Sequence, residues 1–442
     1  MMEPPLGMTK KYIIASAPGR LDVMGGIADY SGSMVLQMPI AQRTTITLLL
    51  REDYQCNLKS EISSGETLTA QVDYRDYLSG GQVDYTFAQG KFKQNPHTAW
   101  IAYVLGCALV LQKENGIDFR GADFTIRSEV PLGKGVSSSA SIEVASMKAL
   151  ADAFHLEFSG TTLPTLAQRV ENLVVGAPCG LMDQLACYLG EPKKLLPIRC
   201  QPDMVEEPIS LPEDISFIGI DSGIRHSVAG ASYGDVRCAA FMGYTIVANL
   251  FGSTQQDLRL EKASQDFSTL PFRGFLCNIS VEQFEESIAH KLPHSLSGKD
   301  FIEEYGISID PVTIIDKQKK YPIRTCASHP VHENQRVLRF KEYLVSLNQP
   351  TSSESRTAIL KSMGQLMYQS HEGYSLCGLG SQRTDEIVTL AKNKHGIYGA
   401  KITGGGNGGT VCLLVDGEGK KSAHKIHQLL CEKYKEELML FE

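Results

Sequence analysis

The stretch Val130-Pro131-Leu132-Gly133-Lys134-Gly135-Val136-Ser137-Ser138-Ser139-Ala140-Ser141-Ile142-Glu143-Val144-Ala145 decides the fold of this chain. Its first half contains a proline and two spaced glycines, which favour an open, turning backbone. In its second half, apolar residues recur at helical spacing from Val144 to Phe154, and Ser137 or Ser138 can cap the start of a helix. We therefore predict a loop followed directly by a helix.

The segment before this loop, residues 122–128, alternates like a strand, so the predicted order is strand, small-residue loop, helix. Free amides at a helix N-terminus, approached by bare glycine backbone, favour anion binding. The serine hydroxyls add donors for phosphate oxygens and a ligand for Mg²⁺. Taken alone, the loop is equally compatible with an ordinary turn and helix cap. The chain has no Gly-x-x-x-x-Gly-Lys-Ser/Thr sequence, which excludes a Walker phosphate loop.

Size and composition indicate a soluble globular protein. A chain of 442 residues predicts two or three domains. The composition, 42% hydrophobic and 21% charged, is typical of soluble chains, and the net charge of -7 argues against a nucleic-acid partner. We expect small-molecule partners and slightly favour a monomer.

The cysteines and the apolar runs indicate in which cellular compartment the protein is expected. The eleven cysteines form no Cys-x-x-Cys pair, and many lie in apolar runs, so we expect reduced core thiols and a cytoplasmic protein. The N-terminus lacks the apolar region of a signal peptide, and no apolar run approaches the length needed to span a bilayer.

Other elements follow from periodicity and from helix stop signals. Residues 55–95 read as an irregular β region that ends in polar turns, and a helix is expected from His97 to Gly106. A helix at 164–175 should stop at Gly176. Further helices are expected at about 235–251, 330–348, 354–373 and 381–393.

The serine loop resembles the Pro-x-x-x-Gly-Leu-Gly-Ser-Ser-Ala-Ala loop of the GHMP small-molecule kinases, in the galactokinase style. A polar, glycine-rich stretch at 20–33 resembles the first galactokinase motif. Its matching residues are Arg20, Gly25, Asp29 and Tyr30. Gly26 and Ile27 stand where that family has Glu-His. On residue type alone, Arg20 and Asp29 would be a solvated surface pair.

Two further stretches carry the resemblance. The run Pro178-Cys179-Gly180-Leu181-Met182-Asp183-Gln184 resembles the galactokinase run with the catalytic aspartate. By itself, an aspartate at a helix start merely complements the helix dipole. Residues 221–237 resemble the family segment whose tyrosine, here Tyr233, lines the sugar pocket; we interpret His226 as a positioning residue.

The last motif is the loop Thr403-Gly404-Gly405-Gly406-Asn407-Gly408-Gly409 between two expected strands. It resembles the third GHMP motif, with Asn407 replacing the usual aromatic residue. Its Gly-x-Gly-x-x-Gly spacing is not a dinucleotide site, because such a site needs a helix after the glycines. We expect these glycines to let the backbone run beside the substrate and the serine loop.

Together the resemblance implies an α+β, two-domain GHMP kinase fold with the active site in the inter-domain cleft. We place the N-terminal domain at 1–205 and the C-terminal domain at 206–442. The implied reaction is phosphoryl transfer from ATP to the anomeric hydroxyl of a galactose-like sugar. In galactokinases the Glu-His pair lies towards the C6 hydroxyl of the sugar. Gly26 and Ile27 offer that hydroxyl no hydrogen-bonding side chain, so the resemblance implies L-arabinose, which lacks the C6 group. The alternatives are a galactokinase acting on D-galactose, a non-catalytic sugar sensor, and a homoserine- or mevalonate-type kinase, which lacks the aspartate run.

The resemblance also assigns roles. Asp183 would orient or deprotonate the sugar hydroxyl, with Arg20 stabilising developing charge. Ser139 would bind Mg²⁺. The expected sugar-binding residues are Asp29, Tyr30, Gly26, Ile27, Gly180 and Tyr233. The expected ATP-binding residues are Gly133, Gly135, Ser137, Ser138, Ser139, Ala140 and Trp100, although Trp100 also suits a core position. The third-motif loop residues are Gly404, Gly405, Gly406 and Gly408.

Overall fold

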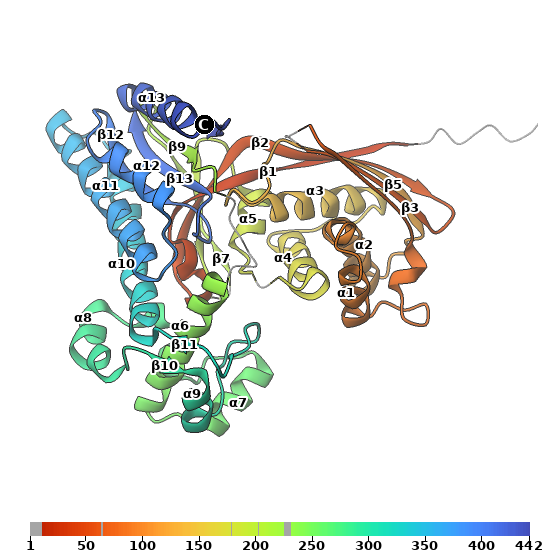
Figure 1. Cartoon of the computed structure of the whole chain (residues 1–442), viewed down its shortest axis with the longest axis horizontal. Helices are drawn as coiled ribbons and strands as arrows, with labels where there is room; N and C mark the ends of the chain where they lie inside the picture. The colour runs from red at the N-terminus through yellow and green to blue at the C-terminus, as the bar shows by residue number, and fades with distance from the viewer. Residues whose placement is uncertain (1–10, 63–64, 178, 202, 225–230) are drawn as a thin grey trace, which may run out of the picture. The chain divides into compact units, whose positions relative to one another are not determined.

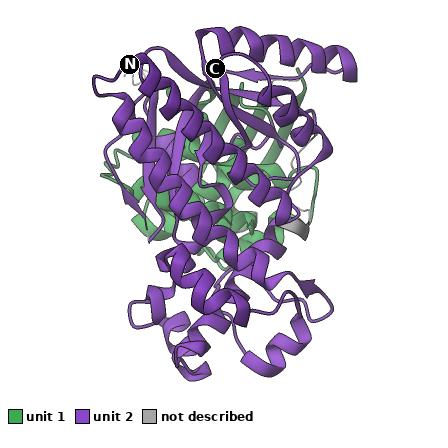
Figure 2. Cartoon of the chain, turned by 90° about the vertical axis from the view of Figure 1, so that its left-hand side faces the viewer, with its two compact units in different colours: residues 1–19, 42–131, 138–179 green, residues 20–41, 132–137, 180–442 purple. Residues whose placement is uncertain are grey.

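The computed structural model describes residues 11–62, 65–177, 179–201, 203–224 and 231–442. The chain forms two compact units, each built from separated stretches (Figure 2). Unit 1 comprises residues 1–19, 42–131 and 138–179, and unit 2 comprises 20–41, 132–137 and 180–442. The expected boundary at 205/206 is a division between family domains and stays a prediction.

Unit 1 is a sheet with helices packed on it (Figure 1). Its strands lie in the order β4-β3-β5-β2, with β3 parallel to β5 and the other two pairings antiparallel. Apolar side chains of α2, such as Leu105 and Leu109, are fully buried. The elements with residues in this unit are β1 (Ile13–Met24), β2 (Met34–Arg51), β3 (Gln55–Ile62), β4 (Thr67–Asp73), α1 (Tyr85–Lys93), α2 (Ala102–Asn115), β5 (Gly121–Ser128), α3 (Ser138–Ala153) and α4 (Thr162–Arg169).

Two predictions for this unit need correction. The region 55–95 is not irregular throughout: β3 and β4 pair regularly, and α1 follows. Asp84 caps α1 by accepting from Phe87 N, but only Ala88 and Phe92 of the helix are buried, so its apolar period is weak. The helix expected from His97 begins later, as a 3-10 turn at Ala99–Ile101 followed by α2.

The helix predicted at 164–175 is present in two forms. It begins as α4 and continues as a wider π-turn at Val170–Val175. The backbone of Gly176 is left-handed, with φ of +78°, which glycine adopts without strain. The predicted stop at Gly176 is therefore confirmed.

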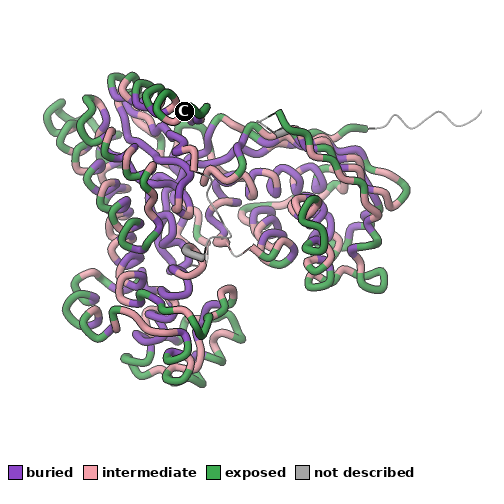
Figure 3. The backbone as a smooth tube through the Cα atoms, viewed as in Figure 1, coloured by how far each residue is buried: buried purple, intermediate pink, exposed green. Residues whose placement is uncertain are grey.

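Unit 2 contains a four-stranded sheet in the order β12-β13-β9-β14. Strands β9 (Ile215–Asp221) and β13 (Thr410–Asp416) are buried along most of their length, whereas α13 (Gly417–Tyr434) is largely exposed on its outer side (Figure 3). The third glycine loop joins β12 (Ile397–Ile402) to β13, so a strand follows the glycines, as predicted.

The rest of unit 2 is mainly helical. One buried apolar cluster joins α6 (Ala231–Leu250), α10 (Ile323–Leu347) and the turn Gly26–Ser31, so the first motif rests on this helical core. The N-terminal part of β2 pairs with β6. The remaining elements are α5 (Met182–Leu189), β6 (Lys194–Arg199), β7 (Met204–Val205), β8 (Ile209–Ser210), α7 (Gln255–Ser264), α8 (Val281–Gln283), β10 (Leu296–Ser297), α9 (Gly298–Tyr305), β11 (Lys320–Tyr321), α11 (Ser353–Leu376), α12 (Gln382–Lys392) and β14 (Leu440–Phe441).

Candidate active site

Arg20 and Asp183 form an ion pair inside unit 2. Arg20 lies on β1 and is 2% exposed, and Asp183 lies in the first turn of α5. The Nε and Nη2 atoms of Arg20 lie 2.9 and 2.7 Å from Asp183 Oδ1. Burial alone would lower the pKa of the Arg20 guanidinium, but Asp183 and Asp22 raise that pKa above its usual value. Arg20 therefore stays charged and holds the Asp183 carboxylate in a fixed orientation.

The loop 132–137 is held against Arg20 and the third glycine loop. Arg20 Nη1 donates to the Gly135 carbonyl over 2.8 Å, and Arg20 N donates to the Val136 carbonyl over 3.1 Å. A Cβ atom on Gly404 would lie 2.8 Å from the Gly135 carbonyl oxygen. Only a bare backbone allows this approach, so the third-motif loop runs beside the serine loop at Gly404, while its expected contact with the substrate stays a prediction.

Ser137 carries a buried hydroxyl in this loop. Within the described part of the chain, its Oγ has no hydrogen-bond partner, and the residue is 8% exposed. The hydroxyl therefore does not cap α3, which corrects one of the two capping alternatives; α3 itself begins at Ser138. Because buried polar groups are nearly always paired, this donor fits a ligand rich in acceptor oxygens, such as a phosphate group.

The start of α3 lies in unit 1, next to buried carboxylates. Glu143 follows Ser139 by one helical turn and is fully buried, and Glu171 in the π-turn is 8% exposed. Burial raises the pKa of Tyr103 most, and Glu171 and Glu143 add to the effect, so both carboxylates lie near this ring. Ser139 and Glu143 thus lie one turn apart on α3 and bring a hydroxyl and a carboxylate, which are donor types that Mg²⁺ accepts.

Asp29 lies in the turn Gly26–Ser31 and is 4% exposed. Its Oδ1 accepts from Tyr30 N over 2.7 Å. A Cβ atom on Gly180 would lie 2.2 Å from Asp29 Oδ2, so position 180 has no room for a side chain. Burial raises the pKa of Asp29 to about 7, although the nearby Arg237 guanidinium lowers it. Asp29 is therefore a carboxyl group that can lose or hold its proton near neutral pH.

Two tyrosines and an arginine pack beside Asp29. The rings of Tyr30 and Tyr233 meet edge to face with centroids 6.2 Å apart, and Arg237 lies 5.8 Å from the Tyr30 centroid. Arg237 is held by two hydrogen bonds to Asp310, of 3.0 and 2.8 Å. The hydroxyl of Tyr30 is buried and has no partner among the described residues. Two aromatic rings and a guanidinium charge therefore lie together beside Asp29.

The replaced pair of the first motif lies in the same turn. Ile27 is 1% exposed and packs in the helical core of unit 2. Gly26 is also buried and brings no side chain. The two positions therefore present only backbone and aliphatic carbon.

The sequence interpretation missed the buried pair Asp22–Lys401. Both side chains are fully buried, and Lys401 Nζ lies 2.7 Å from Asp22 Oδ2. Asp22 Oδ1 also accepts from Gly26 N over 3.0 Å, and Asp22 N donates to Thr403 Oγ1 over 2.6 Å. The position of the two residues was the available signal: Asp22 is two residues beyond Arg20, and Lys401 is two residues before the third glycine loop.

A second missed ion pair holds the serine loop. Lys134 Nζ lies 2.8 Å from Asp221 Oδ2 at the end of β9, and Asp221 is 1% exposed. The Lys134 carbonyl accepts from Thr410 Oγ1 over 2.8 Å. The loop is thus anchored to both central strands of the C-terminal sheet.

The structure describes most of the remaining expected site residues. His226 falls outside the described residues. Trp100 is half-buried in unit 1, and its indole N–H has no acceptor among the described residues. The remaining expected nucleotide-binding residues of unit 1 are Ser138, Ser139 and Ala140 at the start of α3.

All eleven cysteines are free thiols, as expected from their spacing. In the described part of the chain, no helix is both long and apolar enough to cross a membrane. Nor do three or more His, Cys, Asp or Glu side chains gather there into a metal-binding group.

Three protein-family models match parts of this chain. Residues 102–191 match the GHMP kinases N terminal domain, and residues 355–436 match the GHMP kinases C terminal domain. Residues 7–48 match the galactokinase galactose-binding signature. The chain belongs to the GHMP kinases. The expected family and the α+β two-domain fold class are thereby confirmed.

Named relatives place this GHMP kinase near the sugar kinases. It is 40% identical to the L-arabinokinase of Arabidopsis thaliana over 95% of its own length, but it spans only 44% of that protein. It is 29% identical to a galactokinase of Chloroflexus aggregans, over 92% of this chain and 84% of the galactokinase. The stronger identity to an L-arabinokinase agrees with the resemblance of residues 19–32 and 375–381 to that protein.

Solved structures show the same fold. The galactokinase of Lactococcus lactis complexed with galactose superposes with a TM-score of 0.69 at 22% identity, over 98% of this chain and 94% of the other. The mevalonate kinase of Leishmania major in complex with R-mevalonate gives 0.55 at 15% identity, over 100% and 98% of the two chains.

Proposed function

We propose that this GHMP kinase transfers the γ-phosphoryl group of ATP to the anomeric hydroxyl of L-arabinose. The observation that carries the proposal is the Arg20–Asp183 ion pair bonded to the Gly135 carbonyl. It puts a fixed carboxylate and a permanent cation against the predicted phosphate loop, as phosphoryl transfer requires. The 40% identity to an L-arabinokinase supports the sugar.

The reaction needs one proton acceptor and charge stabilisation. Asp183 accepts the proton of the anomeric hydroxyl as that oxygen bonds to the γ-phosphorus and the bond to the β-phosphate oxygen breaks, releasing ADP. Arg20 stabilises negative charge that develops on the transferred group. Asp29, Gly180 and Tyr233 hold ring hydroxyls.

The nucleotide is bound as its magnesium complex. The backbone of Gly133 and Gly135 and the free hydroxyl of Ser137 face the phosphates. Ser139 would hold Mg²⁺, and Glu171 or Glu143 would supply a carboxylate. The ion, when bound, would neutralise phosphate charge. Trp100 lies near adenine in this proposal.

The cytoplasmic location and the monomeric state also remain predictions.

Ser139→Ala is expected to raise the KM for MgATP by about 5- to 150-fold, the range for losing one polar partner of a charged ligand. Sugar affinity, measured by calorimetry without nucleotide, should hardly change. The matched control is Ser146→Ala, a buried serine two turns further along α3. A large loss of sugar affinity in Ser139→Ala with a normal Ser146→Ala would remove Ser139 from the metal site.

Sugar selectivity tests the choice of substrate. L-Arabinopyranose has the ring stereochemistry of galactose but lacks the C6 hydroxymethyl group. Next to Ile27 a C6 hydroxyl finds no side-chain partner, and burying it unpaired costs roughly 1–3 kcal/mol. The kcat/KM for L-arabinose should exceed that for D-galactose by about 5- to 150-fold. An equal or higher value for D-galactose would favour the galactokinase alternative, and no turnover of either sugar would favour the sensor.

A further inference from the structure

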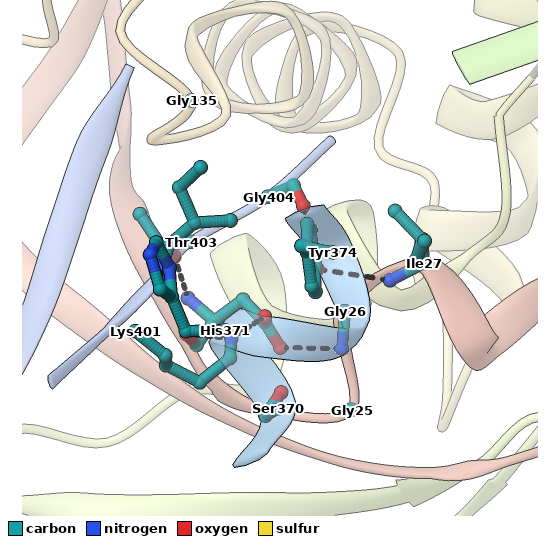
Figure 4. Close-up of polar contacts among 12 residues, drawn as sticks. Gly25, Gly26, Ile27, Gly135, Ser370, His371, Tyr374, Lys401, Thr403 and Gly404 are labelled. Carbon is teal, nitrogen blue, oxygen red and sulfur yellow. Dashed lines mark hydrogen bonds and ion pairs between the residues drawn. The ribbon is translucent and has the colours of Figure 1, made fainter. Parts of the chain in front are cut away.

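The hydroxyl of Tyr374 lies between two loops of the site (Figure 4). Tyr374 belongs to α11 and is fully buried. Its Oη accepts from Ile27 N over 3.1 Å and donates to the Gly404 carbonyl over 2.8 Å. One oxygen thus pairs a backbone group of the first motif with a backbone group of the third.

The same hydroxyl fills the space beside Gly26. A Cβ atom added at Gly26 would lie 1.6 Å from Tyr374 Oη and 2.7 Å from its Cζ. The Gly26 backbone has φ of +45°, a conformation that side chains rarely adopt. Any side chain at position 26 therefore requires Tyr374 to move, and Tyr374 in its present place requires glycine at 26.

Tyr374 cannot move easily, because its ring is fixed on two sides. The ring of His329 meets it edge to face, with centroids 5.7 Å apart and an interplanar angle of 88°. Lys401 Nζ lies 5.3 Å from its centroid. Rigid packing of this kind transmits a small change of shape rather than absorbing it.

Glu333 of α10 holds the same loop at a second point, and α11 orients its carboxylate. Ser370, one turn before Tyr374, donates to Glu333 Oε1 over 2.6 Å. That oxygen also accepts from Gly25 N over 3.2 Å, and Glu333 is fully buried. The backbone of residues 25–27 is therefore held at one end by Glu333 of α10 and at the other by Tyr374 of α11.

We propose that Tyr374 is a positioning residue that determines sugar selectivity: its hydroxyl replaces a side chain at position 26 and fixes Ile27 so that a sugar hydroxymethyl group finds neither space nor a hydrogen-bond partner. This inference rests on the proposed function. Ile27 N already donates to Tyr374, so its N–H is not available to a substrate. A pentopyranose has no hydroxymethyl group, so this arrangement does not weaken its binding.

Tyr374→Phe tests the proposal. Loss of the oxygen frees the Ile27 N–H and opens space beside Gly26, so the D-galactose hydroxymethyl group gains a donor. The ratio of kcat/KM for L-arabinose to that for D-galactose should fall by about fivefold or more, mainly through the two sugar KM values. Tyr368→Phe is the matched control, because Tyr368 lies on the same helix and its hydroxyl has no partner among the described residues. The control should keep the original ratio.

Calorimetric affinities for the two sugars separate this inference from the proposed function, since binding needs no turnover. If the unaltered protein phosphorylates neither sugar, the proposed function is overturned. The ratio of the affinities of Tyr374→Phe for L-arabinose and D-galactose then still decides the inference. If the sugars are phosphorylated but neither ratio moves in Tyr374→Phe, the inference is overturned and the kinase stands.

A double-mutant cycle covers the case in which Tyr374→Phe folds poorly. Gly26→Ala should weaken L-arabinose binding strongly beside Tyr374 and several-fold less in a Tyr374→Leu background, where no hydroxyl meets the new methyl group. Additive effects of the two substitutions would contradict the coupling.

Discussion

Asp183→Asn lowers kcat by about 10²–10⁴-fold and leaves the fold intact; this is the expected result of removing the proton acceptor. The amide keeps an oxygen that can accept from Arg20, whose Nε and Nη2 both bond Asp183 Oδ1 in the unaltered chain. Sugar binding should therefore change much less than turnover. The measurement is kcat at saturating L-arabinose and MgATP, with circular dichroism to confirm folding.

The matched control for this substitution is Asp214→Asn. Asp214 also pairs with an arginine, Arg356, whose Nε lies 2.8 Å from Asp214 Oδ2, but this pair is not part of the candidate site. The control should retain normal turnover. A folded Asp183→Asn protein that turns over at a comparable rate would exclude Asp183 as the base.

Lys401→Met is expected to lower the free energy of unfolding by about 3–5 kcal/mol, because it leaves the Asp22 carboxylate buried without its cation. Both side chains of the pair are fully buried. Urea unfolding followed by circular dichroism measures the change. Combining Lys401→Met with Asp22→Asn removes the uncompensated charge and should recover part of the loss.

An exposed ion pair provides the comparison. Lys421 and Glu418 lie 2.8 Å apart with side chains 70% and 61% exposed, so Lys421→Met should leave the unfolding free energy nearly unchanged. Equal effects of the two lysine substitutions would show that burial of the Asp22–Lys401 pair does not matter to stability.

Local signals in the sequence predicted the elements that carry the motifs. Pro131, Gly133 and Gly135 mark the loop before α3, and both glycines have the positive φ of +70° that such a loop needs. Gly176 ends its helix for the same reason. Asn407 adopts φ of +57° and donates its backbone N–H to the Leu379 carbonyl. Asparagine tolerates that conformation, which gives a physical reason for its presence in the third motif.

The contacts that assemble the site had no local signal. Two such contacts are the Asp22–Lys401 pair and the Gly26–Tyr374 pair. The members of each pair are far apart in the sequence, and the role of one residue cannot be inferred without knowing the other. Gly26 read alone indicates only a missing side chain. Helix α1 was missed for a different reason: with only Ala88 and Phe92 buried, it lacks the apolar stripe from which helices are recognised.

The distance along the chain between the partners of the buried ion pair affects biosynthesis. Asp22 and Lys401 are 379 residues apart. At about 5–20 residues per second, a ribosome needs roughly 20–75 s to add the lysine after the aspartate. During that interval the nascent first motif lacks the cation, the tyrosine hydroxyl and the glycine loop that complete it. The first motif of a newly made chain therefore cannot complete these contacts until synthesis has passed Lys401 and the glycine loop after it.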